Sequence, residues 1–536
     1  MSLVIGISPP EALESRKRLF EALSQAYDMQ FEPRPLYHWD KLDALIAFLP
    51  MEQTRSWTAA PALPSLLIIT NAPRIDAGEG RIVFTSSPAV HPVLRGRYLF
   101  DEYVKEWRML DCHAGDAILA THDGMPIWLA RGNCQFSSIP PDELLPDEPL
   151  IMRFRWGVFL QILPIVDLLR RLQKQNSWVA PPLRACFTFD DPNLHWCSYG
   201  YIDFGQMARH AEVHNYHACM ATTPLDAWFA LPSVARLFRQ HGRRLSLAIH
   251  GNNHLKNELE RPTSEAEALP MLAQALRRVS RFERMNSLSV DRVMVPPHGR
   301  CSESVTRALL RLGYEGVCLS GRPYPWLRKP PENRPAAGWG MTEMVAGGLP
   351  VLHRLSLDLW LEQESYRQNV LLQAYLNRPL IFVGHHQSLR NGLGALAEVA
   401  RQVNSIGKVE WQSLGRIVSS NYMYRVQDNQ LEMKLYARRV CISLPNEVRE
   451  VKVFKSHFGD ANDEEFVFCN GLAAGVGAAK PLVFRPANQA RQIEITLIHQ
   501  HQVGSAAVAP PHYSTWSFSR RILTTIRDRI QPMLSI

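Results

Sequence analysis

The sequence predicts an α/β protein, and the prediction depends on two apolar runs that are each followed by a polar cluster. Residues 185–189 and 245–249 have the length and composition of buried strands. Asp190 and Asp191 follow the first run, and His250 and His254 follow the second. Strand ends can meet on one rim of a barrel or open sheet, so we expect the two carboxylates and two imidazoles to lie close together.

These four side chains are suited to metal-assisted chemistry. One Asp with two His residues is a usual ligand set for a catalytic divalent metal that keeps a position open for water. The neighbouring carboxylate could then act as a general base. An Asp pair at a strand end can also cap a helix or form a turn, so the two clusters indicate a metal site only in combination.

The amino-terminal region, residues 1–150, is predicted to be a separate α/β domain. Residues 3–7 and 65–70 read as strands, and residues 11–27 carry apolar side chains at helical spacing. Two further runs flank His122, Asp123 and Gly124 and predict a hairpin. The pattern resembles flavodoxin-like or glutamine-amidotransferase-like domains. It has no nucleophile elbow, so we expect a structural or specificity role.

The second predicted domain, residues 151–420, contains both polar clusters. A helix is expected over residues 153–175, and the paired prolines at 181 and 182 precede the first strand. Residues 321–340 form a loop rich in Pro, Gly and Trp, a composition typical of a lid or a binding wall. Arg322 and Trp326 in this loop, and Arg354 after the apolar run 349–353, are candidate substrate contacts.

Two segments complete the chain. Residues 421–505 contain short alternating apolar runs separated by turn residues, which predicts a β-sandwich. Residues 506–536 predict a basic amphipathic helix, with Trp516 and Ile526 among its apolar positions and Arg521 and Arg527 among its cations. Such a helix docks on its own protein, on a partner, or as a peripheral element on an anionic membrane.

Composition excludes several classes of protein. The chain has 536 residues, 46% of them hydrophobic, and a net charge of +8 spread along its length, so no nucleic-acid partner is expected. The nine cysteines form no Cys-x-x-Cys pair, which fits reduced thiols. We find neither a leader peptide nor a long apolar span, and we expect a cytoplasmic protein.

The two polar clusters resemble the motifs of the polysaccharide deacetylase (NodB-homology) family. The segment Phe-Thr-Phe-Asp-Asp at 187–191 resembles the family's Thr-Phe-Asp-Asp motif, and 250–254 resembles its His-x-x-x-His motif. The resemblance covers residues 183–415 and implies a distorted, TIM-like (β/α) barrel. It implies that Asp190 is the catalytic base and that Asp191, His250 and His254 bind the metal, for which we expect Zn²⁺.

Two further motifs of the family are present in altered form. Residues 295–299, Val-Pro-Pro-His-Gly, occupy the place of an Arg-x-Pro-x-Gly motif but lack the Arg and add His298. His298 could replace that Arg, become a fourth metal ligand or contact the substrate. The apolar strand 380–384 leads to His385 and His386, either of which could be the general acid. Pro192 stands where the family has Gly, and Asn193, His195 and Trp196 after it are candidate pocket residues.

The resemblance implies a metal-dependent hydrolase that removes an N-acetyl group from an amino sugar or a glycan-related substrate. Two other functions stay open at this stage. The first is a non-catalytic protein that binds a glycan or a partner on a deacetylase scaffold, which the missing Arg favours. The second is a metal-dependent amidase that acts on another C–N bond, because the metal–water chemistry would be the same.

Overall fold

The computed structural model divides the chain into two compact units. The first comprises Met1–Trp178, Pro323–Gly340 and Gln363–Leu376, and the second comprises Val179–Arg322, Met341–Glu362 and Asn377–Ile536. The residues that the structure describes are 3–36, 40–55, 63–71, 74–75, 80–104, 107–175, 177–320, 335–336, 338–345, 348–455, 465–477, 481–486, 492–512 and 514–534.

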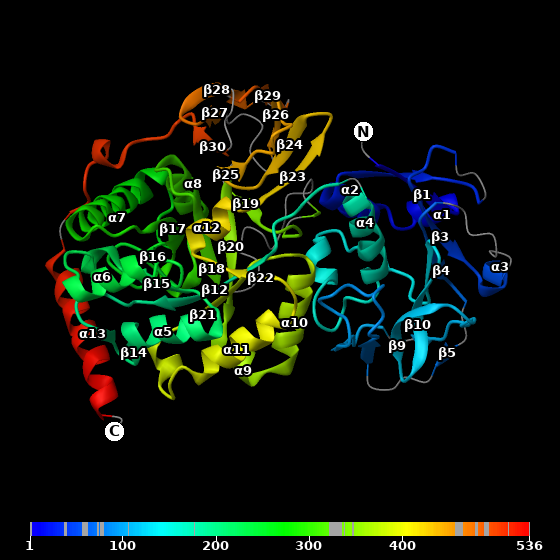
Figure 1. Cartoon of the computed structure of the whole chain (residues 1–536), viewed down its shortest axis with the longest axis horizontal. Coiled ribbons are helices and arrows are strands. Elements are labelled where there is room, and N and C mark those ends of the chain that lie inside the picture. The colour runs from blue at the N-terminus through cyan, green and yellow to red at the C-terminus, as the bar shows by residue number, and fades with distance from the viewer. Residues whose placement is uncertain are drawn as a thin grey trace. The chain divides into compact units, whose positions relative to one another are not determined.

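The first unit contains a nine-stranded mixed sheet (Figure 1). Its first five strands are parallel to their neighbours, and the remaining four extend the sheet in antiparallel pairs. In spatial order the strands are β2 (Met29–Pro33), β1 (Leu3–Ser8), β3 (Ala44–Leu49), β4 (Ser65–Ile69), β11 (Cys134–Ser137), β10 (Met125–Arg131), β9 (Ala117–His122), β6 (Arg81–Phe84) and β7 (Tyr98–Phe100).

Two helix predictions in this unit need correction. The segment 11–27 forms two helices, α1 (Pro10–Glu14) and α2 (Lys17–Tyr27), because Arg16 leaves the helical conformation and donates a hydrogen bond to the Pro141 carbonyl. The helix expected over 153–175 is shorter, since α4 spans Leu163–Gln175. Arg153 instead pairs with Glu148, at 2.7 Å, and ends a 3₁₀ turn. The hairpin around Asp123 and Gly124 is present as β9 and β10.

The second unit is built on a closed barrel of seven parallel strands, which confirms the (β/α) barrel. The first strand, β12 (Leu183–Asp190), pairs with both β15 and β21 and so closes the ring. The other members, in order, are β15 (Ala218–Thr222), β16 (Leu245–His250), β17 (Asp291–Val295), β18 (Gly316–Ser320), β20 (Leu349–Ser356) and β21 (Leu380–Gly384). Two short strands join its edges, β22 (Val409–Trp411) on β12 and β19 (Glu343–Val345) on β20.

Helices surround this barrel in Figure 1. They are α5 (Phe204–His214), α6 (Pro232–Gln240), α7 (Glu265–Asn286), α8 (Glu303–Arg311), α9 (Leu357–Glu362), α11 (Gly394–Asn404) and α12 (Leu414–Ser419). A helix from the connecting segments, α10 (Glu364–Tyr375), belongs to the first unit.

Small side chains fill the centre of the barrel. Cys186, Cys219 and Cys318 lie in one buried cluster with residues of the neighbouring strands and of α12. Alternate residues of a strand share a face, so Asp190 at the end of β12 lies on the same face as Cys186. Its carboxylate is therefore directed to the interior at the carboxyl end of the barrel, where active sites of such barrels are built.

Within 422–499, the described residues form two four-stranded sheets that share one buried core, which includes Met433 and Ile495. The first sheet contains β23 (Tyr422–Gln427), β24 (Gln430–Leu435), β26 (Glu450–Lys455) and β29 (Leu482–Phe484). The second contains β25 (Arg439–Ser443), β30 (Gln492–His499), β27 (Glu465–Cys469) and β28 (Leu472–Gly477). The final helix, α13, spans Thr515–Leu534. Among the described residues, no helix is long and apolar enough to cross a membrane.

Candidate active site

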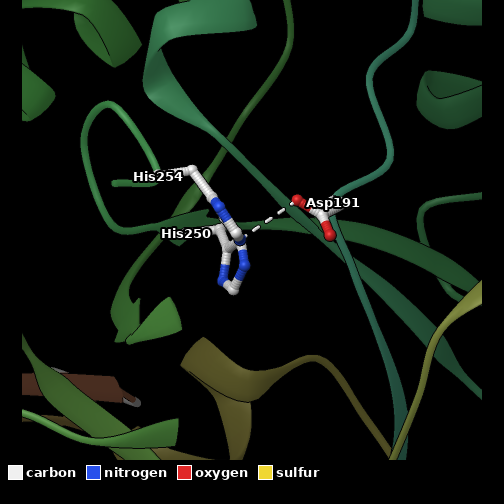
Figure 2. Close-up of side chains that lie close together, drawn as sticks. All are labelled: Asp191, His250 and His254. Atoms are coloured by element: carbon white, nitrogen blue, oxygen red, sulfur yellow. Dashed lines mark ion pairs between the residues drawn. The ribbon is translucent and has the colours of Figure 1, made fainter. Parts of the chain in front are cut away.

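Three of the predicted side chains converge at the carboxyl end of the barrel. Asp191 follows β12, His250 ends β16, and His254 lies in the loop after it. One potential ligand atom from each of the three lies within 4.8 Å of the others (Figure 2). The segments 187–191 and 250–254, separated in the sequence, therefore form one cluster, as the motifs predict.

His250 is held in one orientation by the neighbouring strand. Its Nδ1 lies 2.9 Å from the carbonyl oxygen of Val295 on β17, which accepts a hydrogen bond from the ring. The Nε2 atom then carries the lone pair, because a neutral imidazole has one donor and one acceptor nitrogen. Burial lowers the pKa of His250. This side chain is therefore kept neutral, as a metal ligand must be.

The loop that presents His254 is fastened by a buried carboxylate. Glu258 accepts hydrogen bonds from the backbone N–H groups of Asn252, Asn253 and His254, at 3.0, 2.7 and 3.0 Å. His254 itself has a φ of 56°, in the left-handed region that non-glycine residues seldom adopt. Three hydrogen bonds to one side chain hold this backbone turn and direct the imidazole toward Asp191.

Asp190 forms a buried ion pair with Arg354. The Arg354 Nη1 atom donates to both carboxylate oxygens, at 2.7 and 2.8 Å, and its Nε donates to Ser320 at 2.9 Å. Burial raises the pKa of Asp190, but the charge and hydrogen bonds of Arg354 together with the nearby His250 and His385 outweigh burial, and the pKa lies below its ordinary value. Arg354, predicted as a substrate contact, is thus the partner that keeps Asp190 ionised.

Asp191 also contacts a cation, Arg521 of α13. The Arg521 Nη1 atom donates to Asp191 Oδ1 at 2.8 Å, and Nη2 donates to the Asp191 carbonyl at 2.9 Å. The third nitrogen, Nε, donates to Asp226 at 2.6 Å. Burial raises the pKa of Asp191, but Arg521 together with His254 and His250 outweighs burial, and the pKa is strongly lowered. Asp191 is therefore fully ionised at neutral pH.

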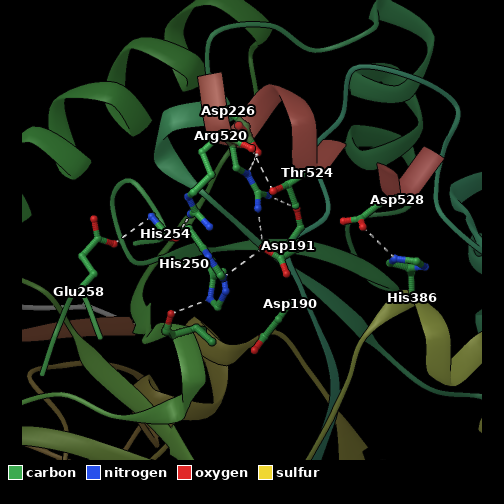
Figure 3. Close-up of polar contacts among 12 residues, drawn as sticks. Asp190, Asp191, Asp226, His250, His254, Glu258, His386, Arg520, Thr524 and Asp528 are labelled. Atoms are coloured by element: carbon green, nitrogen blue, oxygen red, sulfur yellow. Dashed lines mark hydrogen bonds and ion pairs between the residues drawn. The ribbon is translucent and has the colours of Figure 1, made fainter. Parts of the chain in front are cut away.

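Helix α13 covers the cluster with its polar face, as Figure 3 shows. Arg520 donates to the His254 carbonyl, and Asp528 accepts a hydrogen bond from Tyr199 at 2.7 Å. The inward residues of the helix are polar and buried, namely Ser517, Arg521, Thr525 and Asp528. The final helix is thus part of the site and not a separate appendage.

The two candidate acids occupy different environments. His386 is buried and stacks on Tyr201, and its Nε2 lies 3.8 Å from Asp528. His385 is exposed, and it contributes electrostatically to the lowered pKa of Asp190. The imidazole of His385 is therefore within electrostatic range of the predicted base, whereas His386 faces α13.

Two of the three predicted pocket residues after the Asp pair contact α13, and the third contacts the loop that contains Asp226. Asn193 is buried, and its amide lies 3.5 Å from the hydroxyl of Thr525. His195 Nε2 lies 2.9 Å from the Asp226 carbonyl, and the Trp196 ring lies under the guanidinium of Arg529 at 4.2 Å. Their role as substrate contacts remains a prediction.

One other candidate, His298, is not part of this cluster. His298 is exposed with its ring 5.9 Å from that of His254, and it lies outside the three-residue set that could hold a metal. Arg322 and Trp326 lie outside the described residues.

The donor set fits a divalent metal ion. An ionised carboxylate and two imidazoles are ligands that Zn²⁺ accepts, and three protein ligands leave a position for water. The Val295 carbonyl supplies the hydrogen-bond partner that ligating imidazoles ordinarily have. Arg521 donates a hydrogen bond to one carboxylate oxygen of Asp191. A metal bound to Asp191 would therefore share this carboxylate with the guanidinium.

The participation of Asp226 and Arg521 was missed in the sequence. The available signal was a second periodicity in the tail, where Ser517, Arg521, Thr525 and Asp528 recur at helical spacing opposite the apolar stripe. Such a polar stripe predicts solvent contact unless buried partners are known. Those partners come from loops of the barrel, far away in the sequence.

The comparisons agree with the resemblance that the motifs predict. No known family model and no curated protein matches the chain. Similar solved structures include a predicted polysaccharide deacetylase from Mycobacterium smegmatis, with 13% identity over 45% of this chain and 92% of that one and a TM-score of 0.32. A family 4 carbohydrate esterase from Streptomyces lividans has 13% identity over 45% and 93%, with a TM-score of 0.26. A CE4 esterase from Streptococcus mutans has 13% identity over 45% and 94%, with a TM-score of 0.26.

A further similar structure is described as a mutant of a CE4 family pseudoenzyme with restored enzymatic activity. These structures are described as polysaccharide deacetylases or CE4 esterases, the kind of protein that the motifs of this chain resemble.

Proposed function

We propose that this protein is a metal-dependent hydrolase that removes an N-acetyl group from an amino sugar or a glycan-related substrate and releases acetate. The observation that carries the proposal is one juxtaposition. A buried carboxylate, Asp190, is kept ionised beside the three-residue donor set of Asp191, His250 and His254. A base next to a metal site is the arrangement that amide hydrolysis by water requires.

The roles of the side chains follow from their contacts. Asp191, His250 and His254 would hold the ion, which when bound supplies Lewis acidity and acidifies a coordinated water. Asp190 accepts the proton of the attacking water, while Arg354 holds its carboxylate in place. The new C–O bond forms as the amide C–N bond breaks, and a protonated imidazole gives the leaving nitrogen its proton.

We assign that imidazole to His385. It is exposed and lies within electrostatic range of Asp190. His386 is buried between Tyr199, Tyr201 and Asp528, where it supports the contact of β21 with α13. Loss of turnover on His385→Ala, with His386→Ala retaining turnover, is the expected result. The opposite pattern would transfer the acid role to His386.

The flanking regions are proposed to have supporting roles. The amino-terminal sheet is assigned to a flavodoxin- or glutamine-amidotransferase-like domain with a structural or specificity function. The two sheets formed by residues 422–499 are assigned to a β-sandwich that provides packing support or glycan contact. The domain limits at 150, 420 and 505, and the cytoplasmic location, remain predictions.

A second candidate function is a non-catalytic binding protein. The contact of Arg521 with Asp191 favours it, because a guanidinium on a metal ligand can replace the ion. A metal-dependent amidase on another C–N bond uses the same side chains and differs only in the acyl group.

Metal content and product release distinguish these functions. The purified protein should contain about one divalent ion per chain, and the Asp191→Ala/His254→Ala variant should lose it. His214→Ala, which changes an exposed histidine of α5, is the matched control.

The metal-loaded protein is then assayed for acetate and formate release from N-acetylated and N-formylated amino sugars. Release of formate alone favours the amidase. A protein that binds no metal after reconstitution contradicts the hydrolase and favours the binding protein.

A further inference from the structure

Helix α13 packs with the opposite polarity to an ordinary surface helix. Its buried side is polar, whereas large apolar side chains on its outer side are exposed. Trp516 is 68% exposed and Leu523 63%, and Ile522, Ile526 and Ile530 are each more than 40% exposed. Contiguous apolar surface of this kind marks a site of interaction with a protein or a membrane. In Figure 1, α13 lies at the outer edge of the second unit.

The contacts of the polar face explain why α13 turns its apolar side away from the barrel. Arg521 is buried between Asp191 and Asp226, and Asp528 is buried against Tyr199. Rotating the helix to bury Leu523 would expose these ion pairs and leave two carboxylates of the barrel without their cation, at the cost that unpaired buried charges carry. The apolar side is therefore held outward by the contacts of the site.

Cations line both edges of the apolar stripe. At 100° per residue, Arg529 falls at one edge, next to Ile522, and Arg527 falls at the other, next to Trp516. The side chain of Arg527 is 68% exposed although it also contacts Asp528. An apolar centre bordered by arginines is the pattern of a helix that lies in the plane of a lipid interface.

Exposed aromatic side chains of the barrel continue this surface. The guanidinium of Arg529 lies over Trp196, and the neighbouring His195 ring lies 4.6 Å from that of Trp228. Trp228 and Phe229, after the 3₁₀ turn Pro224–Asp226, are 52% and 38% exposed. Tryptophan is suited to the boundary between headgroups and acyl chains, because its ring is large and its N–H is polar.

We propose that this surface, formed by the outer side of α13 with Trp196, Trp228 and Phe229, binds the face of an anionic phospholipid bilayer. Charge complementarity selects this occupant. Arginines at both edges of the stripe would oppose one another in a pair of identical chains, whereas anionic headgroups neutralise them. The polar side of the helix stays on the barrel, so the bilayer lies beside the carboxyl ends of the strands. This proposal does not depend on catalysis.

Vesicle flotation tests the proposal directly with the full-length protein. Vesicles of phosphatidylcholine alone are compared with vesicles that contain equal parts of phosphatidylcholine and phosphatidylglycerol, at low and high salt. We expect binding to the mixed vesicles that weakens with salt. Leu523→Ser/Ile526→Ser should lower the partition coefficient by about tenfold or more, and Arg527→Gln/Arg529→Gln should remove the preference for the anionic lipid.

Matched controls test whether vesicle binding depends on this surface or on any exposed apolar side chain. Val213→Ser on α5 and Met285→Ser on α7 change side chains that are 77% and 58% exposed but lie outside α13, and they should bind as the wild type does. Circular dichroism and metal content verify that each variant is folded. Equal binding by the α13 variants and the wild type would overturn the proposal, as would a wild type that binds neither vesicle.

Light scattering without lipid tests whether a second copy of the chain, and not a bilayer, covers this surface. A wild-type dimer that Leu523→Ser/Ile526→Ser converts to monomers, with no vesicle binding, would assign the surface to a second copy and refute the membrane. Vesicle binding requires neither metal nor substrate, so a failure here leaves the proposed hydrolase standing. Conversely, an inactive protein that still floats with anionic vesicles would refute only the hydrolase.

Discussion

Arg521 donates a hydrogen bond to the same Asp191 oxygen that faces His254. The Nη1 atom of Arg521 lies 2.8 Å from Asp191 Oδ1, and that oxygen lies 3.3 Å from His254 Nε2. A metal ion at the cluster would therefore share the Asp191 carboxylate with the guanidinium of α13. Two cations that share an anion weaken one another's binding, so occupancy by a metal would be coupled to the contact made by the final helix.

Replacement of Arg521 by Met should tighten metal binding. The variant removes the competing charge while keeping most of the side-chain volume, and we expect the zinc dissociation constant to fall by about tenfold, or about 1.4 kcal/mol. Competition with a chelating indicator dye measures this constant. Arg527→Met, on the outer side of the same helix, should leave it unchanged. Weaker binding in Arg521→Met would mean that Arg521 helps to shape the donor set.

Asp190→Asn should abolish turnover without loss of metal. The amide cannot accept the water proton, and removal of a general base costs about 10²–10⁴-fold in rate. The measurement is kcat for whichever substrate releases acetate, together with metal content. Full activity in Asp190→Asn would show that another group is the base. Loss of metal would instead place Asp190 among the ligands.

Arg354→Met should destabilise the barrel because it leaves Asp190 buried without its cation. Removing one partner of a buried ion pair costs about 3–5 kcal/mol. The double variant Asp190→Asn/Arg354→Met should recover much of this loss, because the neutral amide needs no counter-ion. Thermal unfolding of the two single variants and the double variant measures the coupling. Additive effects would contradict a direct interaction.

Glu258→Gln should weaken metal binding although Glu258 is not one of the three predicted ligands. The carboxylate accepts three backbone N–H groups of the loop that carries His254, and an amide offers only one acceptor oxygen. Loss of such a supporting contact typically costs about 10–100-fold in affinity. Zinc titration of this variant beside Glu260→Gln, a nearby control, provides the comparison. Equal affinities would indicate that the loop keeps its shape without Glu258.

The free energy of unfolding should decrease as pH is lowered, because the buried His217 resists protonation in the folded state. This buried side chain contacts the Arg243 carbonyl and the Ser246 hydroxyl, and burial lowers its pKa to about 4. The folded state stays neutral while the unfolded chain takes up a proton below a pH of about 6.5, so unfolding is favoured as pH falls from there. The contribution lost at pH 5 is about 2 kcal/mol.

The variant His217→Gln isolates this contribution. The difference in midpoint temperature between pH 7 and pH 5 should be smaller in His217→Gln than in the wild type. An equal difference in both proteins would mean that other buried groups carry the acid sensitivity.

The resemblance to the deacetylase family implied the barrel, whereas the three-residue cluster could be predicted from local information. The end of β12 carries Asp190 and Asp191, and the end of β16 carries His250. Parallel strand ends in a barrel share one rim, so their order along the chain was sufficient. Within the predicted β-sandwich, the strands β23 and β28 lack a clear sequence signal. The first has only half-buried side chains, and the second contains glycine, so neither has a strong alternating pattern.

The role of α13 could not be predicted because it depends on contacts between distant residues. Apolar periodicity correctly indicates a helix over the tail, but it does not determine which face packs. Arg521 can be buried only because Asp191 and Asp226 neutralise it, and Asp191 lies 330 positions earlier. Likewise, Arg354 could be identified as a notable cation, but its partner Asp190 is on a strand 164 positions away.

The position of α13 also determines the order in which the site is assembled during synthesis. The last barrel strand ends at Gly384, whereas α13 begins at Thr515, after both sheets of the 422–499 region. A ribosome therefore completes Asp191, His250 and His254 well before it makes the helix that covers them. During that interval Arg521 is not yet part of the chain, so a divalent ion at the donor set would meet no competing guanidinium at Asp191.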